Sequence, residues 1–420
     1  MRVEIRPSRA KGVFTAPPSK SMAHRYLICA GLAEGESVIR NLAYSEDVKA
    51  TIACLRALGA DVRLEDDVAY VKGVDVTKPL GMTAILPCNE CGSTLRFFIP
   101  ICLLSDEERV LTGSPRLLMR PLEFYEALAR LQKLKFERSA NRVIVQGPLY
   151  SAIFMCPGNV SSQYFSGMMF ALPFLKKNSW LKIPEPVESR PYIHMTISAL
   201  EKFGIQIKIA SETEADSSKR RFVIIVTGGG KYKPADVTVE GDYSNAAFFE
   251  ALNYAGSDVS VTGLREDSPQ GDKVYKFLFK KINAAQNIIN FDTIDISDCP
   301  DLGPILFAVA AMTGGGRFTG THRLKIKESD RAVAMKHELK KVGIRVDVGE
   351  NDVIVHPGKL RAPIMPILGH NDHRIVMAMS VLLTVTGGVI EGAEAVKKSF
   401  PDFFDRLKDL GVDLSYGMDQ

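Results

Sequence analysis

Apolar residues recur along the chain in two helical patterns that alternate with short strand patterns. In the first pattern they form one stripe, as from Val48 to Leu58, and a charged face remains. In the second, short segments are apolar on every side, which predicts buried helices. We therefore expect striped helices outside and all-apolar helices inside. The all-apolar helices are predicted over Ser21–Ala33, Gly92–Leu104, Ser161–Leu175, Asp242–Ala255, Asp301–Met312 and Asn371–Thr384.

The striped helices close on an apolar–glycine step that precedes a strand pattern. Clear copies end at Gly59, Gly204, Gly343 and Gly411, and weaker copies cover 122–136 and 274–289. Successive copies lie roughly 70 residues apart, which indicates six repeats of two helices with about four strands. The predicted fold is α/β, in two domains of three repeats each.

Glycine and proline crowd together over Thr227–Pro234, which marks a boundary between the third and fourth repeats. Few residues follow Gly411, so the predicted strand Arg2–Arg6 is expected to complete the last repeat. The chain then crosses between domains twice, and one domain covers 14–235 while the other covers 1–13 and 236–420. Two crossings at one edge favour a hinge that closes over a ligand.

Composition and charge exclude several classes of protein. With 46% apolar and 24% charged residues, neither disorder nor a fibrous repeat is expected. A net charge of +4 without a basic run argues against nucleic acid. The first 20 residues lack a signal-peptide pattern, and the apolar stretch Ile375–Ile390 is too short to span a membrane. We expect a cytoplasmic monomer.

The seven cysteines show no disulfide spacing, and they are expected to be reduced. Cys88 and Cys91 form the one CxxC pair, and ordinary packing is favoured over a metal or redox role because the sequence offers no second pair and no histidine nearby. The chain has no nucleotide-binding, metalloprotease or serine-hydrolase motif. No cofactor and no metal are predicted.

Polar residues gather where the all-apolar helices begin. Helix N-termini offer free N–H groups and partial positive charge, so they attract anions. Serine, threonine, aspartate and asparagine at such ends also act simply as caps. Capping does not need cations, however, and Arg25, Arg96 and Arg374 each lie in the first turn or two of a helix with almost no other charge. A buried arginine needs a partner.

Further basic residues lie in turns that precede helices, and each one alone is typical of a solvated surface. Together they predict a cleft for small substrates with several phosphate or carboxylate groups. Asp301 and Glu328 are the carboxylates in matching positions, and two carboxylates among cations suit acid/base chemistry. These basic residues are Arg116, Arg120, Arg190, Lys325, Lys327, Arg331 and Lys398.

Eight motifs, in order along the chain, resemble the signature series of the EPSP synthase (3-phosphoshikimate 1-carboxyvinyltransferase) family. The resemblance implies an inside-out α/β barrel in each domain, built from three βαβαββ units. It also implies transfer of the enolpyruvyl group of phosphoenolpyruvate to the 5-hydroxyl of shikimate 3-phosphate, a step of aromatic amino-acid biosynthesis. The motifs are Pro18–Arg25, Leu111–Pro121, Val160–Gln163, Ser189–Tyr192, Pro300–Asp301, Lys327–Arg331, Asn371–Arg374 and Lys398–Asp402.

By the same resemblance, residues that match the motifs bind the two anionic substrates, and the domain over 14–235 is the shikimate 3-phosphate side. The residues implied for shikimate 3-phosphate are Ser21, Arg25, Ser161, Ser162, Gln163, Ser189, Tyr192, Asp301 and Lys327. Those implied for phosphoenolpyruvate are Lys20, Gly92, Arg120, Arg331, Arg374 and Lys398. Glu328 with Lys20 is expected to handle the proton at the methyl carbon, and Asp301 to orient or deprotonate the 5-hydroxyl.

The chain departs from the family pattern before the second all-apolar helix. The usual Asn-Ala-Gly-Thr reads Asn89-Glu90-Cys91-Gly92-Ser93, and Phe97 stands where proline is common. Arg323 occupies the place of an asparagine that precedes the substrate lysine.

Two other functions stay open. The sister enolpyruvyl transferase acting on UDP-N-acetylglucosamine shares fold and donor, but Lys20-Ser21 and the cysteine-free segment 112–120 argue against it. A repeat-built binding scaffold explains the sixfold pattern without explaining carboxylates placed among cations.

Overall fold

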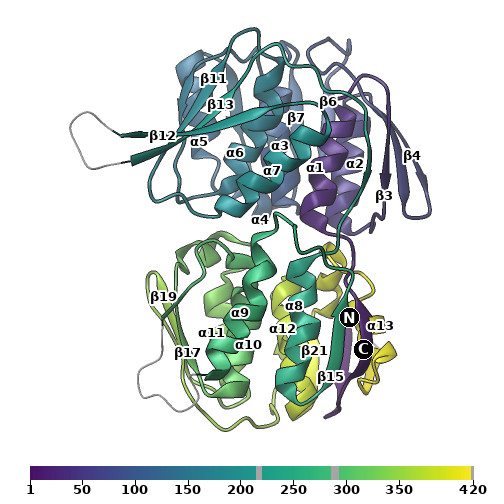
Figure 1. Ribbon diagram of the computed structural model, residues 1–420, viewed down its shortest axis with the longest axis vertical. Coiled ribbons are helices and arrows are strands. Elements are labelled where there is room, and N and C mark those ends of the chain that lie inside the picture. Colours follow the sequence, from purple (N-terminus) through teal and green to yellow (C-terminus); the bar gives the residue numbers. More distant parts are fainter. Residues whose placement is uncertain (214–219, 285–292, 418–420) are drawn as a thin grey trace. The chain divides into compact units, whose positions relative to one another are not determined.

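The predicted helices and strands are present in the computed structural model, which describes residues 1–213, 220–284 and 293–417. The chain divides into two units, and both chain ends belong to the first (Figure 1). Unit 1 contains Met1–Pro17 and Glu240–Gln420, and unit 2 contains Pro18–Val239. The divisions follow Pro17 and Val239, whereas the sequence placed them after residues 13 and 235.

The six predicted all-apolar helices are buried, as expected. Along α10, every described residue except Met312 is buried, because no polar face exists to meet water. Two of them turn into a 3-10 segment before the predicted end: η1 covers Leu172–Phe174, which includes Pro173, and η2 covers Leu252–Ala255. The buried helices are α1 Lys20–Gly31, α3 Gly92–Cys102, α6 Ser162–Ala171, α8 Tyr243–Ala251, α10 Gly303–Thr313 and α12 His373–Thr386.

The remaining helices keep an exposed face, and side-chain caps fix where several of them begin. Ser45 accepts a hydrogen bond from the backbone of Val48, and Asp330 does the same for Val333. Residues 285–289 of one predicted helix lie outside the described residues. The helices with an exposed face are α2 Glu46–Ala57, α4 Pro115–Leu118, α5 Glu123–Gln132, α7 Arg190–Lys202, α9 Tyr275–Ala284, α11 Arg331–Lys341 and α13 Phe403–Asp409.

Unit 2 has three four-stranded sheets with helices α1, α3 and α6 packed among them (Figure 1). The sheet orders are β6-β7-β9-β8, β10-β11-β13-β12 and β14-β3-β5-β4. In each, the first two strands are parallel and the other pairs are antiparallel. The strands are β3 Glu36–Arg40, β4 Asp61–Glu65, β5 Val68–Lys72, β6 Ala84–Pro87, β7 Arg109–Thr112, β8 Lys135–Arg138, β9 Arg142–Gln146, β10 Ile153–Met155, β11 Ser179–Pro184, β12 Ile207–Thr213, β13 Arg220–Val226 and β14 Asp236–Thr238.

Unit 1 has two sheets of the same order, β16-β17-β19-β18 and β20-β21-β1-β22, and the pair β15-β2. Strand β1 lies between β21 and β22, so the N-terminal strand completes the last sheet, as predicted. The strands are β1 Arg2–Ile5, β2 Lys11–Thr15, β15 Asp258–Thr262, β16 Thr293–Asp295, β17 Gly316–Thr319, β18 Val346–Val348, β19 Asp352–Val355, β20 Ile367–Leu368, β21 Gly388–Glu391 and β22 Leu414–Gly417.

A strand precedes each crossing between the units, and this strand pairs within the unit that the chain is leaving. Strand β2 precedes α1 but pairs with β15 in unit 1, and β14 precedes α8 but pairs with β3 in unit 2. This pairing sets the divisions after Pro17 and Val239, because each strand stays with its partner. No helix among the described residues has both the length and the apolar character needed to cross a membrane.

Candidate functional site

The start of α1 presents Lys20 beside the start of α2. Lys20 Nζ donates to Asp47 Oδ2 at 2.7 Å, and both side chains are largely buried. Ser19 caps the helix by accepting from the backbone of Met22, and the carbonyl of Ser21 accepts from Arg25 at 2.7 Å. The helix start therefore gathers two cations, Lys20 and Arg25, within one turn or so.

Arg25 is buried and held by neutral groups. Its guanidinium donates to Thr196 Oγ1 at 2.9 Å and to the carbonyl of Tyr192 at 3.2 Å, with Ser166 Oγ at 3.5 Å. Burial lowers the pKa of Arg25 to about 10. None of these acceptors is a carboxylate, so the positive charge is not neutralised by them and favours an anionic ligand. Sequence reasoning missed Ser166 and Thr196, which lie 141 and 171 residues from Arg25.

The start of α6 places Ser161, Ser162 and Gln163 together. Ser161 accepts from the backbone of Gln163, whose side chain donates to Ser93 Oγ at 2.9 Å. Arg96 Nη1 donates to Gln163 Oε1 at 2.7 Å, so the starts of α3 and α6 are joined. Burial, with a contribution from Arg120, lowers the pKa of Arg96 to about 10.

Gly92, the first residue of α3, lies directly beneath the Arg120 guanidinium. A Cβ atom at Gly92 would lie 2.4 Å from Nη1 and 2.8 Å from Cζ of Arg120. Arg120 is buried at the end of the segment after α4. A side chain at Gly92 would displace the Arg120 guanidinium, and the two residues implied for one substrate are neighbours.

Ser189 and Tyr192 lie at the start of α7. Ser189 adopts a left-handed backbone conformation with φ 57° and is buried. The Tyr192 ring lies under the Arg25 guanidinium, with 6.0 Å between the ring centroid and Cζ. Unit 2 therefore brings the ten residues that the family resemblance implies for it to the helix starts of α1, α3, α6 and α7 or to the Arg120 segment.

In unit 1, Asp301 accepts from three cations. Lys327 Nζ and Arg331 Nη1 lie 3.1 and 2.8 Å from Oδ1, and Arg374 Nη2 lies 3.2 Å from Oδ2. These residues come from the 3-10 segment η5 (Pro300–Leu302), the turn before α11, and the starts of α11 and α12. The sequence predicted this grouping of a carboxylate with cations.

Arg331 connects Asp301 to two further carboxylates. Its Nη2 donates to Glu328 Oε2 at 2.7 Å and its Nε to Asp372 Oδ2 at 2.9 Å. Asp372 lies in the motif Asn371–Arg374, but its bond to Arg331 was not predicted; it also caps α12 by accepting from the backbone of Arg374. Lys398, later in the chain, donates from Nζ to the backbone carbonyl of Asn371 at 2.6 Å.

Burial and charge shift the pKa values of two groups in this cluster. Burial opposes ionisation of Asp301, but Arg374, Lys327 and Arg331 outweigh it and hold the pKa of the carboxyl well below its usual range. Burial lowers the pKa of Lys327 to about 8 despite the nearby Asp301. Asp301 is therefore an ionised hydrogen-bond acceptor near neutral pH, and Lys327 titrates close to it.

Beside this cluster lies Asp272, which sequence reasoning did not single out. It is buried in the 3-10 segment η3 (Gly271–Val274) and accepts a hydrogen bond from Ser244 at the start of α8. Burial, then the charge of Asp301, raises the pKa of Asp272 to about 6. Arg323, the residue in the place of a family asparagine, is buried and donates to the carbonyl of Ser297.

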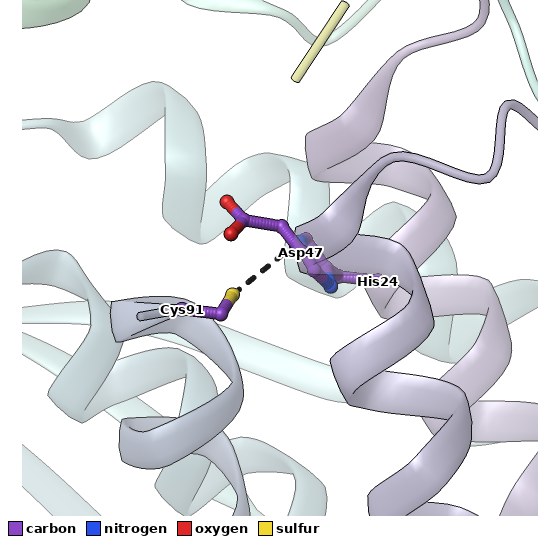
Figure 2. Close-up of side chains that lie close together, drawn as sticks. All are labelled: His24, Asp47 and Cys91. Carbon is purple, nitrogen blue, oxygen red and sulfur yellow. Dashed lines mark hydrogen bonds between the residues drawn. The ribbon is translucent and has the colours of Figure 1, made fainter. Parts of the chain in front are cut away.

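The structure corrects one argument about Cys91. The sequence offered no histidine near the CxxC pair, but His24 Nε2 lies 3.8 Å from Cys91 Sγ (Figure 2). Asp47 lies beside them, and one donor atom from each residue falls within 4.8 Å of the others. All seven cysteines are free and buried. His24 and Cys91 are 67 residues apart in the sequence, and the packing of the folded chain brings them together.

Comparison with known proteins gives a family match over nearly the whole chain. The model of the EPSP synthase (3-phosphoshikimate 1-carboxyvinyltransferase) family matches residues 5–407. A 3-phosphoshikimate 1-carboxyvinyltransferase from Clostridium perfringens is 38% identical, with 98% of each chain covered. One from Clostridium acetobutylicum is likewise 38% identical over 98% of each chain.

Solved structures share the fold. The EPSP synthase from Acinetobacter baumannii aligns with a TM-score of 0.76 at 23% identity, with both chains fully covered. The enolpyruvyl transferase NikO from Streptomyces tendae aligns with a TM-score of 0.74 at 14% identity, covering 100% of this chain and 99% of that one. The two-domain mixed α/β fold is therefore that of the EPSP synthase structures.

Proposed function

Because this chain belongs to the EPSP synthase family, we propose that the residue clusters of its two units together carry that family's reaction. The reaction transfers the enolpyruvyl group of phosphoenolpyruvate to the 5-hydroxyl of shikimate 3-phosphate and releases phosphate. The assignment of residues rests on the surroundings of Asp301, whose ionised carboxylate is bonded to Lys327, Arg331 and Arg374.

The first step is addition. A proton moves to the methylene carbon of phosphoenolpyruvate, the central carbon becomes cationic, and the 5-hydroxyl oxygen bonds to it while losing its proton. The product is a tetrahedral ketal phosphate. Glu328 with Lys20 delivers the proton to the methylene carbon. Asp301 stays ionised because of its low pKa, so it accepts a hydrogen bond from the 5-hydroxyl and orients it. As the oxygen bonds to the central carbon, the hydroxyl proton passes to Asp301 and from there to solvent.

The second step is elimination. The bond between the central carbon and the phosphate oxygen breaks, a proton leaves the methyl group, and the enol ether forms. Glu328 takes that proton back. Lys398, Arg120 and Arg331 stabilise the negative charge on the departing phosphate, since cations placed where charge develops lower the barrier.

The two substrates bind different residues, according to the chemistry of their charged groups. Serine hydroxyls with one buried cation suit the phosphate of shikimate 3-phosphate, and Arg25 with its neutral partners meets that description. The residues proposed for shikimate 3-phosphate are Ser21, Arg25, Ser161, Ser162, Gln163, Ser189, Tyr192, Asp301 and Lys327. Those proposed for phosphoenolpyruvate are Lys20, Gly92, Arg120, Arg331, Arg374 and Lys398.

The test is phosphate release from phosphoenolpyruvate with either shikimate 3-phosphate or UDP-N-acetylglucosamine. We expect turnover with the first acceptor alone. Asp301→Asn and Glu328→Gln should lower kcat by about 10²–10⁴-fold, the range for a positioned acid or base, while each substrate KM changes only a few-fold. Asp61→Asn, on the exposed face of β4, is the matched control.

Near-normal kcat in both variants would show that these roles are wrong. Proton exchange into phosphoenolpyruvate in deuterated water tests Glu328 separately, because that exchange needs the proton at the methylene carbon and not the orientation of the hydroxyl. Turnover with UDP-N-acetylglucosamine would instead favour the sister transferase, and turnover with neither acceptor would favour a binding scaffold.

The finer fold description also stays a proposal. We propose six βαβαββ repeats, three in each of two inside-out barrels, with the shikimate 3-phosphate side in unit 2 and with unit 1 closing over phosphoenolpyruvate. The common order of five four-stranded sheets supports the repeat. We also propose a cytoplasmic monomer, in which free thiols stay reduced; sedimentation measures its mass.

A further inference from the structure

Three side chains of unit 2 with different donor atoms meet below the starts of α1, α2 and α3. His24 comes from α1, Asp47 from α2, and Cys91 caps α3. One donor atom of each lies within 4.8 Å of the others, and all three side chains are buried (Figure 2). Imidazole nitrogen, carboxylate oxygen and thiolate sulfur are the three ligand types that zinc takes in proteins.

The histidine is oriented as a metal ligand would be. His24 Nδ1 lies 2.7 Å from Thr51 Oγ1, and Thr51 in turn lies 2.7 Å from Thr94 Oγ1. With Nδ1–H donated to Thr51, the lone pair is on Nε2, the atom that faces Cys91 Sγ at 3.8 Å. A hydrogen bond from the non-ligating nitrogen fixes the tautomer of metal-binding histidines in the same way.

Burial and the charge of Asp47 raise the pKa of the Cys91 thiol to about 12, whereas Lys20 and the hydrogen bond from Thr94 act against this rise. Cys91 Sγ accepts from the backbone N–H of Thr94 at 3.4 Å, at the N-terminus of α3. The partial positive charge of a helix N-terminus favours an anion at this position. Cys91 also lies in the segment where the chain departs from the family pattern.

We propose that His24, Asp47 and Cys91 bind one zinc ion, or a divalent ion of similar preference, with an open fourth position. Binding replaces the thiol proton, which passes to solvent, and forms one bond each to sulfur, nitrogen and oxygen. No oxidation or reduction takes place.

The ion inhibits the reaction through Lys20. Asp47 is the carboxylate that holds Lys20, at 2.7 Å. A dication on Asp47 competes for the same carboxylate and repels the ammonium, so Lys20 moves from the place where it serves phosphoenolpyruvate. This half of the inference rests on the proposed function, and the binding half does not.

Binding is measured directly with cobalt, which substitutes for zinc and gives a sulfur-to-metal absorption band when a thiolate is a ligand. The full chain is stripped with a chelator, kept reduced and titrated with Co²⁺, and Zn²⁺ then displaces it. We expect one Co²⁺ per chain with the thiolate band. Cys91→Ser preserves the helix cap and should lose the band.

Cys102→Ser is the matched control, since it removes a buried thiol from the other end of the same helix. Its band should equal that of the parent. A band retained in Cys91→Ser, or lost equally in both variants, would overturn the site. His24→Gln supplies a second variant; it should bind Co²⁺ at least about tenfold more weakly, as expected when a ligand is lost.

Inhibition is measured by phosphate release at a fixed low Zn²⁺ concentration. The parent and Cys102→Ser should lose activity and recover it with chelator, while Cys91→Ser should stay active at about tenfold higher Zn²⁺. Equal inhibition of all three would overturn the link to Lys20. If the band behaves as expected but no chain turns over phosphoenolpyruvate, the proposed function fails and the metal site stands.

Discussion

Replacing Gly92 with alanine tests the contact between the start of α3 and Arg120. The new Cβ would lie 2.4 Å from Arg120 Nη1, whereas ordinary contact begins at 3.4 Å. The guanidinium must therefore move by about 1 Å, and a 1 Å misplacement costs up to roughly 100-fold in an enzyme reaction. If Arg120 grips phosphoenolpyruvate, Gly92→Ala should raise the phosphoenolpyruvate KM by about 10–100-fold.

Stability should move in the other direction. Gly92 is the first residue of α3 and has no positive φ, so alanine adds no backbone strain there and lowers the conformational entropy of the unfolded chain. The melting temperature should accordingly stay level or rise slightly. A fall in activity therefore reports the displaced arginine and not unfolding.

The assay is initial phosphate release over a range of phosphoenolpyruvate at saturating shikimate 3-phosphate. Gly303→Ala is the control, because Gly303 is also the first residue of a buried helix, α10. Its Cβ would lie at ordinary contact distance, 3.4 Å from the Leu324 methyl groups and 3.5 Å from Ile296 Cδ1. That variant should keep its KM. A phosphoenolpyruvate KM for Gly92→Ala within twofold of the parent would refute the reasoning.

Two further measurements test charge and packing. Burial lowers the pKa of Lys327 to about 8, so this lysine is cationic only below that pH. The value of kcat/KM for shikimate 3-phosphate should therefore fall as pH rises through about 8. Lys327→Arg stays charged over this range, and the same fall of kcat/KM in this variant would contradict the assignment. Ile5→Ala removes a buried side chain from β1, the inner strand of its sheet, and should lower the free energy of unfolding in urea by about 2–5 kcal/mol. Glu4→Ala on the exposed face should change it by less than about 0.5 kcal/mol, and equal effects would contradict the role of burial.

The sequence was sufficient where one pattern had one structural solution. A segment such as Gly303–Thr313, apolar on all sides, has no stable place except the interior, so burial of the helix followed directly. The strand at Arg2–Ile5 was assigned to the last sheet because that repeat lacked strands of its own. Both inferences depended on counting elements and not on knowing which residues touch.

Side-chain partners distant in the sequence were beyond prediction. Arg25 was expected to need a partner, but period and spacing do not reveal that Thr196, 171 residues away, supplies one. For the same reason, the sequence did not predict that His24 and Asp47 lie beside Cys91. Strand pairing was not predicted either, because the sequence pattern does not show that β2 and β14 each pair in the unit that the chain is about to leave.

The placement of β1 has a consequence for how the protein is made. Its partners are residues 388–391 and 414–417, so β1 leaves the ribosome long before either partner strand is made. At 5–20 residues per second, that delay is about 20–80 s. All strands of the unit over Pro18–Val239 exist long before then. Unit 2 can thus fold while β1 remains an unpaired strand that chaperones can bind.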